Sequence, residues 1–137
     1  MSTPTLYTPA ILALAVELAA FPFDETLPFT AEARSQTCGS RICMALSCDP
    51  AGGVDKVGVT LQACAIGQAA TALFVKAVAG MDREQLVLAR DALRSWLSGE
   101  GSRPDWPGLE LLDAVPDYPG RHGAVLLAWN AAITALS

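Results

Sequence analysis

The stretch "RICMALSCDPAGGVDKVGVTLQA", residues 41–63, predicts the centre of the fold, because it reads as two strands joined by a turn. In its first part, apolar side chains recur at every second position, at Ile42, Met44, Leu46 and Cys48. A cluster of turn-forming residues, "DPAGG" at 49–53, comes next. Alternation then resumes on one face of a second strand, at Val57, Val59, Leu61 and Ala63. This pattern predicts an antiparallel hairpin.

The residues before the hairpin predict a helix and a weaker strand. Thr8 and Pro9 suit the N-cap and first position of a helix that ends near Ala20. The segment "FTAEAR", residues 29–34, alternates weakly and predicts an additional strand.

The residues after the hairpin predict helices only. Residues 65–80 are apolar nearly all round, as expected of a buried central helix. Asp82 and Gln85 have the spacing of a capping box at the start of another helix, and a last helix is expected over 119–136. The order predicts an α+β fold, with a small antiparallel sheet of two to three strands after an N-terminal helix, packed against C-terminal helices. A chain of 137 residues is long enough for one such domain, 1–137.

Composition excludes some classes of function. The net charge is −5 and the nine basic residues are scattered, which argues against nucleic-acid binding. The apolar start is interrupted by Glu17 and closed by Pro22, and the first basic residue is Arg34. A signal peptide needs an early positive charge and a membrane span needs about 20 uncharged apolar residues. We therefore expect a cytoplasmic protein with no membrane contact, in which cysteines are thiols.

Four cysteines are the candidates for chemistry: Cys38, Cys43, Cys48 and Cys64. Cys64 falls where a strand gives way to a helix, so the helix dipole favours its thiolate form. Cys38 precedes Gly39 in "TCGS", just before a strand, and the hairpin can bring it beside Cys64 at one edge of the sheet. Cys43 and Cys48 lie an odd number of residues apart and face opposite sides of their strand. The pattern leaves open whether the thiols bind metal, act as nucleophiles or fill the core.

Three segments together resemble a known family: "TCGSRICMALSCD" (37–49), "VGVTLQACAIGQAATALF" (57–74) and "WPGLELLDAVPDYPGRHGAVLLAW" (106–129). They are similar to iron–sulfur cluster scaffold proteins of the IscU, SufU and NifU N-terminal type, and most similar to the SufU-like branch. The resemblance covers roughly residues 5–136 in the same order and implies a SufE/NifU-like fold. It implies no enzyme activity with a substrate of its own.

The resemblance also implies a ligand set, of which this chain keeps two members. Family members hold a [2Fe–2S] cluster or a zinc ion with three cysteines and an aspartate, or a histidine in the IscU branch. Cys38 and Cys64 match the first two cysteines. Ser40 stands at the aspartate position and Ala124 at the third cysteine, so these two positions are degenerate and the chain could hold no metal. His122, by a one-residue slip, and Cys43 are the weaker candidates for a substitute ligand.

Three functions follow as alternatives. The first is a cluster assembly protein with a degenerate site, which two chains of a homodimer would complete with four cysteines. The second is a SufE-like acceptor of persulfide sulfur from a cysteine desulfurase, with Cys38 as its thiolate. The third is a metal-free protein that acts by contact with other cluster-assembly proteins.

Overall fold

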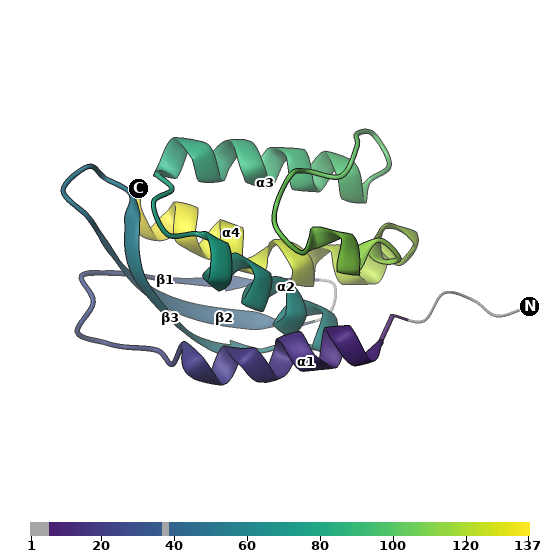
Figure 1. The fold of residues 1–137 in the computed structure, drawn as a ribbon, viewed down its shortest axis with the longest axis horizontal. Helices are drawn as coiled ribbons and strands as arrows, with labels where there is room; N and C mark the ends of the chain where they lie inside the picture. Colours follow the sequence, from purple (N-terminus) through teal and green to yellow (C-terminus); the bar gives the residue numbers. More distant parts are fainter. Residues whose placement is uncertain (1–5, 37–38) are drawn as a thin grey trace, which may run out of the picture.

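A computed structural model of the chain describes residues 6–36 and 39–137 (Figure 1). Three strands form one antiparallel sheet in the order β1-β2-β3: Phe29–Arg34, Arg41–Cys48 and Val54–Gln62. Four α-helices accompany the sheet: α1 (Pro9–Glu17), α2 (Ala65–Ala77), α3 (Arg83–Leu97) and α4 (His122–Ala135). Short 3-10 helices lie at Leu18–Ala20, Leu109–Leu112, Val115–Asp117 and Pro119–Arg121. The α+β fold predicted from the sequence is confirmed, including the weak first strand.

The helices cover one face of the sheet in layers. α4 packs against β1 and β2, and α2 packs between α1 and α4. α3 contacts α4 on the side away from the sheet (Figure 1). On the covered face, Ile42, Met44 and Leu46 of β2 are fully buried, as their alternation predicts.

β3 begins three residues earlier than the alternation indicates. Val54 gains two backbone partners outside the hairpin, because its N–H donates to the carbonyl of Met81 and its own carbonyl accepts from Gly80. The ladder is irregular between Leu46 and Cys48, where one extra residue of β3 is accommodated as a bulge, since 55 and 56 lie opposite Ser47. These contacts come from residues far along the chain, so the local pattern does not contain them.

The helix ends follow the predicted caps. The Thr8 hydroxyl accepts a hydrogen bond from the Ile11 N–H at 3.2 Å, which caps α1. Asp82 and Gln85 form a complete capping box at the start of α3. α4 begins at His122 rather than at Pro119, because residues 119–121 form a 3-10 turn.

The loop after α3 is fixed to the core through Trp106. Its indole N–H donates to the carbonyl of Leu73 at 2.9 Å, and its ring stacks on Phe74. Phe74 and Trp106 both meet Trp129 of α4 edge-on. One aromatic cluster therefore joins α2, this loop and α4.

Over residues 6–36 and 39–137, the helices are too short or too polar for any of them to cross a bilayer.

Candidate cysteine site

Cys64 occupies the N-cap of α2, in extended backbone conformation. Its side chain makes no capping hydrogen bond and is half-buried at the edge of the core. The first free N–H groups of a 13-residue helix surround this position, and they favour a negatively charged group. The thiol is thus held at the N-terminal end of α2.

Ser40 comes to the same end of the sheet as Cys64. In the β2–β3 ladder Arg41 pairs with Gln62, so the residue before Arg41 and the residues after Gln62 emerge side by side. The loop between β1 and β2 is closed by a bond from the Ser35 N–H to the Ser40 carbonyl at 2.8 Å. Gly39 adopts a φ of +71°, which favours glycine at this turn. Ser40 itself is 4% exposed.

Cys38 belongs to the same loop but lies outside the described residues. Its predicted position beside Cys64 therefore stays a prediction.

Ala124 packs against the first turn of α2. A Cβ built on Gly67 would lie 3.2 Å from the Ala124 Cβ, so the two helices touch at this point. Gly67 follows Cys64 by three positions, which places both on one face of the helix. Ala124 is completely buried. The position matched to the third cysteine of the family thus lies next to the helical turn that carries Cys64.

His122 is turned toward the preceding loop. Its Nε2 lies 3.2 Å from the carbonyl oxygen of Val115 and 3.1 Å from that of Pro116. Carbonyl oxygens accept only, so Nε2 carries the proton and donates to them. Ligation through Nε2 would have to break both bonds.

Cys43 lies on the sheet face opposite the helices. It alternates with the buried Ile42 and Met44, and its thiol donates to the Glu32 carboxylate at 3.5 Å. Burial, and then the bond to Glu32, raise the pKa of this thiol above its ordinary value. Cys43 is therefore separated from Cys64 by the sheet and is a protonated thiol near neutral pH.

Cys48 is half-buried at the end of β2 and packs against the core. Burial, and then the charge of Asp49, raise the pKa of its thiol. This environment is that of a thiol packed against the core.

Comparison with known proteins finds similar structures. No family model matches the chain, and no curated protein matches it in sequence. A nitrogen-fixing NifU-like protein (N-terminal) from Brucella abortus is 27% identical with a TM-score of 0.85, over 95% of this chain and 91% of that one. A putative iron–sulfur cluster assembly scaffold protein for the SUF system of Fervidobacterium islandicum AW-1 is 20% identical with a TM-score of 0.83, over 96% and 97%.

The chain has the NifU/SufU fold. The resemblance recognised in the sequence is confirmed, because the match extends over nearly the whole of both chains. The fold class and the order of its elements are those that the resemblance implies.

The described residues do not by themselves make up the ligand set of a NifU/SufU-type site. Zinc and iron–sulfur sites use about four protein ligands, and Cys64 is the one thiol that the described part of this site offers. The Ala124 methyl group donates nothing, and the Ser40 hydroxyl stays protonated near neutral pH. Within the described ranges, no group of three or more His, Cys, Asp or Glu side chains is arranged to hold a metal ion.

Gly67 was missed at the sequence level. Its importance comes from the crossing of α2 and α4 rather than from its local sequence. Its place one turn after Cys64, in an otherwise alanine-rich helix, was the available signal.

Proposed function

We propose that this protein takes part in iron–sulfur cluster assembly as a SufU/IscU-like protein with a degenerate site. The observation that carries the proposal is the NifU/SufU fold over nearly the whole chain, together with Cys64 at the N-cap of α2. In this proposal Cys38 and Cys64 are thiolate ligands or sulfur carriers, and a cysteine desulfurase is the sulfur donor.

The cargo would be a [2Fe–2S] cluster or a zinc ion. One chain supplies two cysteines, Cys38 and Cys64, and two chains of a homodimer supply the four ligands that such cargo needs. Shared ligation explains how Ser40 and Ala124 can lack donor groups without loss of the site. The α2 N-terminus would stabilise the negative charge of Cys64 in each copy.

Sulfur transfer is the second candidate, because it requires a single thiolate at a time. The attacking thiolate bonds to the terminal sulfur of a persulfide on the desulfurase. The sulfur–sulfur bond of that persulfide breaks and the desulfurase cysteine leaves as a thiolate. The exchange therefore needs no added oxidant or reductant.

Anaerobic purification with iron, sulfide and zinc analysis separates these functions. Shared ligation predicts two irons or one zinc ion per dimer, lost in both Cys38→Ser and Cys64→Ser. Cys43→Ser is the matched control and should keep its metal, since Cys43 lies across the sheet. Sulfur transfer predicts a metal-free protein that gains 32 Da per sulfur atom accepted, measured by mass spectrometry after incubation with a desulfurase and cysteine (about one sulfur per thiolate). A protein with neither property would act by contact alone.

A gain-of-ligand variant tests the assignment of the degenerate positions. Ser40→Asp with Ala124→Cys should bind zinc tightly, whereas each single change should bind it weakly. Because Ala124 is buried against Gly67, the added sulfur should cost about 1–3 kcal/mol of stability in the absence of zinc. No gain in zinc affinity would show that Ala124 is not the third ligand position.

A further inference from the structure

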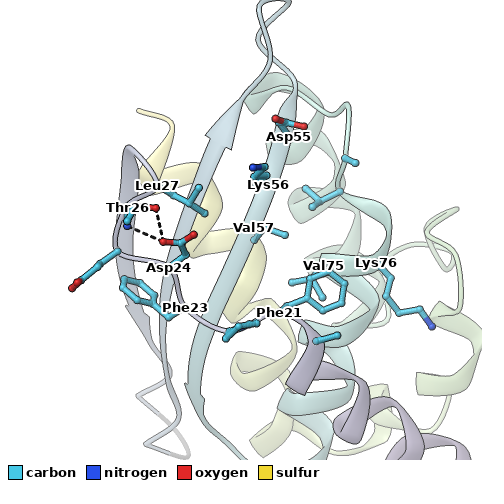
Figure 2. Close-up of a pocket in the computed structure, with 15 residues that line it drawn as sticks. Phe21, Phe23, Asp24, Thr26, Leu27, Asp55, Lys56, Val57, Val75 and Lys76 are labelled. Carbon is cyan, nitrogen blue, oxygen red and sulfur yellow. Dashed lines mark hydrogen bonds between the residues drawn. The ribbon is translucent and has the colours of Figure 1, made fainter.

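A groove of about 1020 Å³ lies at the end of the molecule opposite Cys64 (Figure 2). The segment 20–27 forms one wall, and residues of 75–79, at and just after the C-terminal end of α2, form the other. The start of β3, 55–57, lies between them. Cys64 stands at the other end of both α2 and β3, so the groove shares no residue with the cysteine site.

The edge of β3 is open along this groove. β3 is the last strand of the sheet, and its outer edge is bonded at Val54 by Gly80 and Met81, and at Val59 by the carbonyl of Phe21. The Val59 N–H bonds outward, and Val57 is two residues away, so the N–H and C=O of Val57 also point outward. Among the described residues, no backbone group pairs with Val57 on that side. Four residues, 55–58, lie between the bonded positions Val54 and Val59, and among them Val57 presents its N–H and C=O outward.

The groove is apolar beside this edge and acidic at its rim. The apolar side chains of Phe21, Val57 and Val75 line it (Figure 2). Asp24, Glu25 and Asp55 contribute three negative charges, and Lys56 one positive charge. The remaining cation, Lys76, points away from the groove and is paired with Glu17 at 3.0 Å.

The Asp24 carboxylate is held in its charged form. It accepts hydrogen bonds from the Thr26 hydroxyl at 2.6 Å and the Thr26 N–H at 2.9 Å. These bonds lower the pKa of Asp24, the hydroxyl bond most, with a smaller contribution from Lys56. Asp24 therefore keeps its negative charge at neutral pH.

We propose that this groove binds a short extended peptide segment of a partner protein, in which basic side chains alternate with apolar ones. The main chain of the segment would pair with Val57 by strand addition, which supplies directional hydrogen bonds without a sequence requirement. One face of an extended segment would place its apolar side chain on Phe21 and Val75. The other face would place its cations near Asp24 and Asp55. A second copy of this chain is disfavoured, because its net charge of −5 would meet a rim of the same sign.

The inference goes beyond the proposed function and does not depend on the cysteines. Its test uses the capped peptide Lys-Val-Lys-Val-Lys as the probe and 15N-labelled full-length protein. We expect saturable amide shifts centred on Val57 and Phe21, with a dissociation constant at least tenfold lower than for Glu-Val-Glu-Val-Glu. N-methylation of the central lysine, which removes its N–H, should weaken binding by a similar factor.

Protein variants complete the test. Asp55→Asn and Asp24→Asn should each weaken the Lys-Val peptide about threefold, and Asp91→Asn on α3 is the charge-matched control that should leave affinity unchanged. Shifts that are absent up to millimolar peptide, or that occur equally with both peptides, would overturn the proposal. Shifts at Val57 that depend on protein concentration without peptide would overturn it in favour of self-association. Loss of the cluster-assembly readouts in a cysteine variant would leave these outcomes unchanged.

Discussion

At the scale of single residues, Gly67 sets how closely α4 approaches the turn that carries Cys64. In Gly67→Ala, the new methyl group would meet the Cβ of Ala63 at 2.8 Å and that of Ala124 at 3.2 Å. Helix propensity favours alanine by about 1 kcal/mol, but overpacking against Ala63 and against Ala124 of α4 costs about 1–3 kcal/mol. We expect net destabilisation by about 1 kcal/mol in urea unfolding. Gly120→Ala, where the added Cβ meets nothing within 4 Å, should not be destabilised.

Asp24 provides a residue-scale prediction on pH. Its pKa is lowered in the folded state, so it stabilises the fold above the ordinary carboxyl pKa of about 3.9, and this contribution disappears as pH falls through the lowered value. Thr26→Val removes the hydroxyl that lowers this pKa most. We expect the Asp24 pKa to rise toward its ordinary value, measured by NMR titration of the carboxyl carbon. Thr26→Ser keeps a hydroxyl and should keep the lowered pKa.

At the scale of elements, the capping box of α3 makes a testable contribution to stability. The Asp82 carboxylate accepts from the Gln85 N–H at 2.9 Å, and the Gln85 side chain accepts from the Asp82 N–H at 2.9 Å. Asp82→Ala removes the acceptor of the Gln85 N–H, keeps the backbone N–H that donates to the Gln85 side chain, and should lower the free energy of unfolding by about 1 kcal/mol. Asp82→Asn retains an acceptor and should cost markedly less. Equal losses in the two variants would contradict a capping role.

The elements that could be predicted from the sequence are those with a local signal. The period-2 pattern of 41–48, the Thr8 cap and the Asp82 box are local signals, and each element that they predict is present. The early start of β3 depends on Gly80 and Met81, and the Gly67 contact depends on a helix 57 residues later. Such long-range contacts leave no period in the sequence. The groove was missed for the same reason, since its walls come from three separate segments.

In the candidate site, too, some features could be predicted from local sequence and others depend on contacts between distant residues. The position of Cys64 at a helix start follows from the change of period between strand and helix. The position of Cys38 beside Cys64 remains a prediction. The orientation of His122 toward Val115 and Pro116 depends on a turn that no local sequence motif predicts. The proximity of Ala124 to Cys64 could be predicted only from the resemblance to the IscU, SufU and NifU type, because no local pattern relates two residues so far apart in the sequence.

At the scale of the whole molecule, we propose that residues 1–137 unfold as one unit. α4 packs on β1 and β2, and the aromatic cluster ties it to α2 and to the loop of Trp106. Thermal unfolding followed by tryptophan fluorescence, which reports the helical layer, should therefore coincide with unfolding followed by far-UV circular dichroism. Trp106→Phe removes the bond to Leu73 and should shift both curves together. Two separate transitions would show that the sheet and the helices are independent.

The placement of Cys64 and the groove at opposite ends of α2 has a consequence for how complexes could form. A helix of 13 residues is about 20 Å long, so a contact centred on Cys64 and a contact centred on Val57 would lie about that far apart. In the two proposals together, a sulfur donor at Cys64 and a peptide segment at Val57 would bind separate ends of the molecule. A sulfur donor and a basic peptide segment would then form one ternary complex with this protein, bound at opposite ends of α2.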